Sequence, residues 1–142
     1  MTNDARHCLE AVLDREIEVA RQLAATLAAE REALIGNTPA AAAEQAANKV
    51  ALLGTFAGLE SERRSIAEPP FSQISDTAAQ RWRDLMEVMS VCQKANDVNG
   101  YIINVRRVQV RQLIDVVRGG AAVTYGPQGK TFAIALRALA RA

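Results

Sequence analysis

The feature that most constrains the fold is an unbroken helical seam between residues 82 and 117. Its members recur at alternating steps of three and four across 36 residues, a spacing that places side chains on one face of a long α-helix. The seam comprises Trp82, Leu85, Met89, Cys92, Asn96, Asn99, Ile103, Arg106, Val110, Leu113 and Val117. At about 1.5 Å per residue the seam is ~54 Å long. A compact domain cannot hide so long a helix, so the seam predicts long helices packed side by side.

A second helical pattern lies near the N-terminus. Its face comprises Leu9, Leu13, Ile17, Ala20, Leu23, Leu27 and Leu34. This spacing predicts one helix over residues 4–35. Gly36, Thr38 and Pro39 then supply a C-cap glycine, an N-cap threonine and a proline at the first helical position. Because this order ends one helix and begins the next, we expect a tight turn between antiparallel helices.

The second helix is predicted over residues 39–67 and the third over residues 76–118. The second begins in an alanine tract, and its seam comprises Leu52, Phe56, Leu59, Arg63 and Ile66. Two prolines at positions 69 and 70 stop it, because proline lacks the backbone N–H that a helix needs. Ser75 or Asp76 is the expected N-cap of the third helix, and two glycines at positions 119 and 120 close it.

Together these helices predict a single all-α domain over residues 1–120. Short connections make the first pair antiparallel, and the third helix can lie against both, giving an elongated antiparallel three-helix bundle or coiled coil. An aromatic content of 4% and 27 alanines among 142 residues suit long helices and argue against a β-sandwich. Residues 121–142 are predicted to be a flexible, weakly amphipathic C-terminal tail that binds a partner.

The sequence offers little for catalysis. His7 is the only histidine, so there is no histidine-based triad, acid–base pair or multi-histidine metal site. The glycines follow no predicted strand and precede no Gly-Lys-Ser or Gly-Lys-Thr, so they form no phosphate-binding loop. We expect a protein that is not an enzyme and uses no cofactor or metal.

The N-terminal residues predict a cytoplasmic protein that does not insert into a membrane. Charged side chains stand where a signal peptide needs its apolar stretch, and no apolar run approaches the ~18 residues of a membrane span. Cys8 and Cys92 are therefore expected to be free thiols with a packing role.

Charge is unevenly distributed along the chain. Residues 1–100 carry 10 basic and 15 acidic side chains, whereas residues 101–142 carry 7 and 1. The basic residues Arg106, Arg107, Arg111 and Arg118 could neutralise phosphates. They also lie in the C-terminal half of a helix, where cations are favoured by the macrodipole, and they offset the acidic first helices. Because no aromatic stacking platform accompanies them, we expect no nucleic-acid partner.

Asn96 and Asn99 interrupt the apolar seam at its middle. Amides at core positions lower stability but fix register and partner choice, so we interpret the pair as a register device. On this interpretation, replacing both by leucine raises thermal stability and broadens the oligomer distribution. A local polar kink with Gly100 is the alternative.

The tail carries the clearest functional signal in the residues themselves. Phe132, Leu136 and Leu139 lie at i, i+4 and i+7, with Ile134 among them, as in a segment that folds on a partner. Tyr125 precedes them in a turn rich in glycine and proline. A frayed end, or one packed on the bundle, is the competing interpretation.

Three strings in this order and spacing carry a family resemblance. They are Leu59-Glu60-Ser61-Glu62-Arg63-Arg64, then Cys92-Gln93-Lys94-Ala95-Asn96-Asp97-Val98-Asn99-Gly100, then Thr124-Tyr125-Gly126-Pro127-Gln128-Gly129. From about Leu9 to Gly129 the chain resembles the flagellar export chaperone family FlgN, while its last dozen residues match only in character.

The resemblance implies a cytoplasmic chaperone of the bacterial flagellar type III export system. Such a protein binds the hook-filament junction proteins FlgK and FlgL through its C-terminal region, and a tyrosine, here Tyr125, docks on the export gate FlhA. The alternative from another class is a structural or regulatory coiled-coil protein that acts by self-association. Capture of a substrate's C-terminal peptide separates the chaperone from the scaffold.

Overall fold

The computed structural model describes residues 1–119 as three α-helices. They are α1 (Asn3–Ile35), α2 (Pro39–Ile66) and α3 (Asp76–Val117), with bounds within one residue of those predicted. Residues 1–119 contain no strand, so the all-α, three-helix prediction is confirmed.

The helix ends follow from local chemistry. The hydroxyl of Thr2 accepts from the backbone N–H of Ala5 at the start of α1. At the start of α3 Ser75, rather than Asp76, caps by accepting from Ala78. The α1–α2 turn has the predicted C-cap Gly36, N-cap Thr38 and Pro39 at the first helical position. Asn37, not Gly36, has the positive φ, at 53°, and Thr38 occupies the N-cap position of α2 without a capping side-chain bond.

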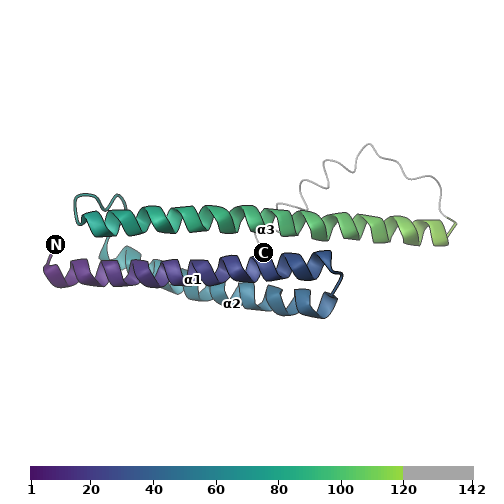
Figure 1. Ribbon diagram of the computed structural model, residues 1–142, viewed down its shortest axis with the longest axis horizontal. Coiled ribbons are helices and arrows are strands. Elements are labelled where there is room, and N and C mark those ends of the chain that lie inside the picture. The colour runs from purple at the N-terminus through teal and green to yellow at the C-terminus, as the bar shows by residue number, and fades with distance from the viewer. Residues whose placement is uncertain (120–142) are drawn as a thin grey trace.

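The helices run up, down and up, with α1 between the other two (Figure 1). The contacts of α1 with α2 step forward along α1 and backward along α2, from Glu16–Arg63 to Glu30–Lys49, as in an antiparallel pair. Two contacts of α3 side chains with α1 backbone carbonyls, about two turns apart along both helices, have the same offset of 72 residues, as in a parallel pair. The direction of α2 is therefore opposite to that of α1 and α3.

The third helix contacts both other helices, as expected, but it packs more closely on α1 than on α2. No Cα of α2 comes within 8 Å of a Cα of α3, whereas α1 packs on both. Long side chains bridge α2 and α3 instead, such as Arg63 over the ring of Trp82. The contact between α2 and α3 is therefore made by side chains.

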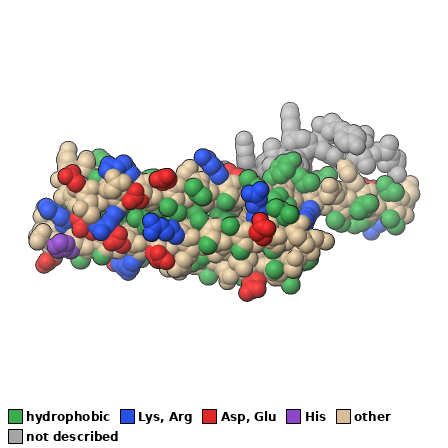
Figure 2. Space-filling view, in the orientation of Figure 1, with side chains coloured by type: hydrophobic (Ala, Val, Ile, Leu, Met, Phe, Trp, Pro, Cys, Tyr) green, Lys and Arg blue, Asp and Glu red, His purple; other side chains and the backbone are tan. Residues whose placement is uncertain are grey.

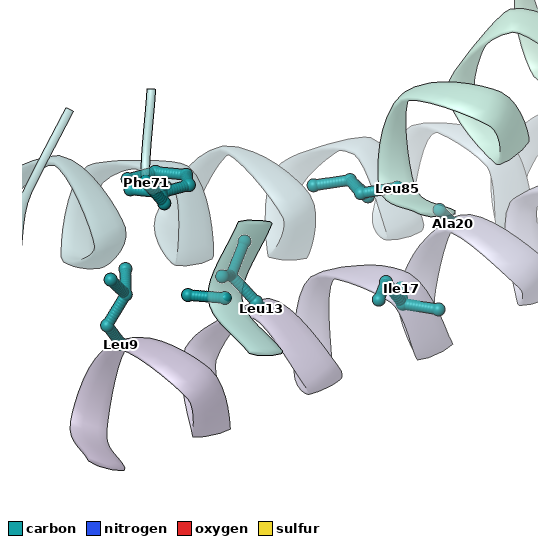
Figure 3. Packing of buried hydrophobic residues seen from close by; sticks show 7 residues of the cluster. Leu9, Leu13, Ile17, Ala20, Phe71 and Leu85 are labelled. Carbon is teal, nitrogen blue, oxygen red and sulfur yellow. The ribbon is translucent and has the colours of Figure 1, made fainter. Parts of the chain in front are cut away.

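The hydrophobic core is concentrated at the end of the bundle that holds the N-terminus (Figure 3). Its buried cluster comprises Leu9, Leu13, Ile17, Ala20, Phe71, Ala78 and Leu85. Phe71 comes from the α2–α3 connection and meets Trp82 edge to face, with ring centroids 5.4 Å apart. A smaller cluster of Leu23, Leu27 and Cys92 continues the core toward the α1–α2 turn.

The C-terminal part of α3 extends past the other two helices (Figure 1). The Arg106 guanidinium donates to the backbone carbonyl of Ile35 at 3.3 Å and to Asn37 Oδ1 at 3.4 Å, so the α1–α2 turn lies beside Arg106. Residues 107–117 continue for about 17 Å beyond this point at the rise of an α-helix. We call these residues the distal segment.

Candidate partner-binding surface

The predicted α3 seam is covered along only part of its length. Leu85, Cys92 and Asn99 are buried. Trp82, Met89, Asn96, Ile103 and Arg106 are half-buried. The last three seam residues are exposed: Val110 by 55%, Leu113 by 65% and Val117 by 85%. The long helices pack side by side, as predicted, but not along the whole seam, because α1 ends and α2 begins near Arg106.

The exposed seam residues form one apolar surface. Ile114 lies beside them on the helix and is 43% exposed; we call Val110, Leu113, Ile114 and Val117 the distal stripe. Figure 2 shows apolar atoms gathered at this end of the molecule, whereas charges of both signs are mixed over the rest of that face. Large contiguous apolar patches on a protein surface often mark interaction sites.

Arginines border the distal stripe. Arg107, Arg111 and Arg118 follow each other at steps of four and seven, which aligns them along the helix. A shallow open depression is lined by Arg106, Arg107, Val110, Arg111 and Ile114. The distal segment therefore offers a partner both an apolar contact and positive charge.

The covered part of the bundle contains two buried polar layers that join its helices. In the first, Arg63 Nε donates to both carboxylate oxygens of Glu16, at 3.2 and 3.1 Å. The guanidinium carbon of Arg63 lies 4.7 Å from the ring centroid of Trp82. Burial raises the pKa of Glu16, and the charge of Arg63 partly offsets that rise.

The second layer contains both seam asparagines. Asn99 Nδ2 donates to Glu30 Oε1 at 2.8 Å and to the Leu27 carbonyl at 2.9 Å. Lys49 Nζ lies 3.3 Å from Glu30 Oε2 and donates to Asn96 Oδ1 at 3.1 Å. The two amides thus join a buried carboxylate and its lysine, rather than forming a polar kink with Gly100.

The sequence interpretation missed Glu16 and Glu30. Both are buried, with 0% and 2% exposure, and both stand in one series of seven-residue steps with Leu9 and Leu23. That alternation was the available signal, because a polar residue in a core series must find a partner inside. Arg63 was placed on the α2 seam by its spacing, and Glu16 is the partner that this placement required.

The two cysteines are free thiols. Cys92 donates to the backbone carbonyl of Ala20, and burial raises the pKa of its thiol. The thiol form, which is the unreactive one, is therefore favoured at Cys92. This agrees with its predicted packing role, while Cys8 is exposed.

Some predictions fall on other parts of the chain. The predicted partner-binding residues Tyr125, Phe132, Ile134, Leu136 and Leu139 lie outside the described residues. Within residues 1–119, no group of three or more His, Cys, Asp or Glu is placed to hold a metal ion. None of the helices α1 to α3 is long and apolar enough to cross a membrane.

Comparison with family models gives a match. Residues 1–132 match the model described as FlgN protein, which covers most of the chain. Comparisons with curated proteins and with solved structures gave no match.

Proposed function

The chain belongs to the FlgN family of flagellar export chaperones, and from this premise we propose that it binds the hook-filament junction proteins FlgK and FlgL and delivers them to the export gate protein FlhA. In this proposal it acts in the cytoplasm, performs no chemical reaction and needs no cofactor. Its role is to cover an assembly-prone segment until export.

One observation supports this function above the others: neither α1 nor α2 covers the distal segment of α3. A chaperone that keeps a helical segment from assembling needs an apolar surface with no partner of its own. The distal stripe provides such a surface, and the rest of α3 is fixed on α1 by the buried layers at Glu16 and Glu30. A substrate helix can therefore bind to a rigid support.

In this proposal the C-terminal tail contacts both the substrate and the export gate. We assign Phe132, Ile134, Leu136 and Leu139 to substrate contact, because a short segment gains a stable helix only by burying its apolar residues. Tyr125 is assigned to docking on FlhA. Binding of this kind is reversible, so a competing contact at the gate is sufficient to release the substrate.

The second candidate function is self-association as a structural or regulatory coiled coil. The same exposed seam residues support it, since Val110, Leu113 and Val117 have the spacing of a coiled-coil seam. A scaffold of this type forms dimers or larger oligomers without any substrate.

Titration calorimetry with the C-terminal peptides of FlgK and FlgL tests the proposal. We expect a complex of defined stoichiometry with the full chain. Deletion of residues 130–142 should weaken it about tenfold or more, corresponding to at least ~1.4 kcal/mol, with little change in the melting temperature. A chain that binds neither peptide and only self-associates in sedimentation velocity would support the scaffold instead.

The gate step is tested separately with Tyr125→Ala. This variant should bind both peptides normally and lose affinity for the cytoplasmic domain of FlhA, with reduced motility and junction-protein secretion in cells. Tyr101→Ala is a matched control, because Tyr101 is an exposed tyrosine on α3. Normal FlhA binding by Tyr125→Ala would contradict the assignment.

A further inference from the structure

The arginines of the distal segment lie along one edge of the distal stripe. At about 100° per residue, Arg107, Arg111 and Arg118 fall within roughly 40° of one another around the helix axis. The opposite edge of the stripe carries the uncharged residues Gln109 and Val116. The distal segment therefore has an apolar strip with positive charge on one side and none on the other.

We propose that this surface binds an amphipathic helix of a partner protein whose apolar face is flanked on one side by acidic residues. The proposal rests on the proposed chaperone function and adds the chemistry of the segment that is recognised. The apolar face of the partner covers the distal stripe, and its carboxylates pair with Arg107, Arg111 and Arg118. Such pairs set the orientation and choice of partner more than they raise affinity.

The position of the partner helix follows from how α1 packs on α3. Along the covered part, α1 lies over the seam at Cys92 and Asn99, and it ends where Arg106 contacts Ile35. A partner helix in line with α1 would cover the next three turns of the same seam. Arg81 of α3 already pairs with two carboxylates of α1, Glu10 at 3.5 Å and Asp14 at 2.7 Å, so an acidic partner would repeat a kind of contact that the bundle makes within itself.

Charge argues against the other occupants of this surface. Residues 106–118 contain four arginines and one aspartate, so a second copy would bring like charges together. Residues 120–142 contain three basic side chains and no acidic one, so the chain's own tail has the same disadvantage. The phosphates of an anionic membrane or a nucleic acid would not lie along only one side of a bound helix. The arginines, in contrast, line a single edge of the distal stripe.

Three designed helical peptides of about 21 residues test the proposal without using FlgK or FlgL. They share one leucine and isoleucine seam and carry glutamate, glutamine or lysine along one flank. With the full chain at low salt, the glutamate peptide should bind about tenfold more tightly than the lysine peptide, since each of a few exposed charge pairs contributes modestly. The glutamine peptide should bind with intermediate affinity.

The double variant Arg107→Glu/Arg111→Glu should reverse this preference. Its matched control is Arg21→Glu/Arg31→Glu, which makes the same change in net charge at two exposed positions of α1 and should keep the glutamate preference. Far-ultraviolet circular dichroism checks that both variants fold.

Equal binding of the three peptides, or a preference that the double variant leaves unchanged, would overturn the proposal. Dimerisation abolished by Leu113→Glu, without any peptide preference, would assign the surface to a second copy. Binding to anionic vesicles or to DNA that needs Arg107 and Arg111, again without peptide preference, would assign it to those ligands. Failure of the FlgK and FlgL peptides alone would reject the proposed function and leave the acidic-helix preference measurable.

Discussion

The covered and distal parts of α3 have the same seam spacing but opposite surroundings. Leu85 is 1% exposed and Leu113, on the same seam, is 65% exposed. The difference is due to α1, which packs over the first residue and ends before it reaches the second. Periodicity therefore identifies the face of a helix that binds a neighbour, while the length of the neighbouring helices decides where that face is free.

The two parts also differ in how their polar groups are matched. In the covered part, Asn99 and Asn96 contact Glu30 and Lys49 from the other helices. In the distal segment, the arginines line an apolar strip that neither α1 nor α2 reaches. The buried charges of Glu16, Arg63, Glu30 and Lys49 are thus paired within the chain, and charge on the distal segment is available to a partner.

The largest expected effect in this comparison is the loss of the first buried layer. Arg63→Ala leaves the Glu16 carboxylate buried without its cation and removes the contact with Trp82. Breaking a buried pair in this way costs about 3–5 kcal/mol. Urea unfolding measures it as a fall in the free energy of unfolding.

The neighbouring arginine is the control for this change. Arg64 is exposed and pairs with Glu60 one turn away, so Arg64→Ala should change the free energy of unfolding by less than ~0.5 kcal/mol. Equal losses for the two variants would mean that the buried layer adds nothing beyond an exposed ion pair.

A smaller effect is expected at the second layer. Asn99→Leu removes the donor to Glu30 and Leu27, so we expect a loss of about 1–3 kcal/mol. The sequence alone predicted that leucine at positions 96 and 99 raises stability, because it shows no partners of Asn96 and Asn99 inside the bundle. Thermal unfolding separates the two expectations, with Asn48→Leu, an exposed asparagine on α2, as control. Increased stability of Asn99→Leu would restore the earlier interpretation.

The smallest effect concerns pH. Because burial raises the pKa of Glu16 above its ordinary value of 4.5, the folded protein binds this proton more tightly than the unfolded chain does. The resulting stabilisation is present at low pH and is lost as pH rises through the folded pKa. The wild type should therefore gain stability relative to Glu16→Gln as pH falls from neutral toward 4.5. A difference between the two proteins that is constant with pH would contradict this pKa direction.

Much of the fold follows from sequence periodicity and helix-stop signals. Three local features of the chain predicted the number and order of the helices. They are the α3 seam, the glycine-proline turn near residue 38 and the prolines at 69 and 70. The pairing of Glu16 with Arg63 did not follow, since it depends on the register between two helices. Phe71 was missed because it lies in a connection, where no periodicity marks a buried residue.

The candidate surface was predicted only in part. The spacing placed Val110, Leu113 and Val117 on the seam, but nothing local shows that α1 ends beside Arg106. The predicted tail residues, including Tyr125 and Phe132, remain predictions, and the distal stripe adds a surface that sequence alone treated as part of the core.

The central claim is that one continuous seam of α3 holds the bundle together at Leu85 and binds a partner at Leu113. The most direct test replaces each leucine by alanine and measures, for both variants, urea unfolding and affinity for the FlgK C-terminal peptide. We predict that Leu113→Ala changes the free energy of unfolding by less than ~0.5 kcal/mol and weakens peptide binding about tenfold, whereas Leu85→Ala lowers the free energy of unfolding by about 2–4 kcal/mol. If Leu113→Ala instead destabilised the bundle as much as Leu85→Ala and left peptide affinity unchanged, the distal seam would be part of the core and the claim would be contradicted.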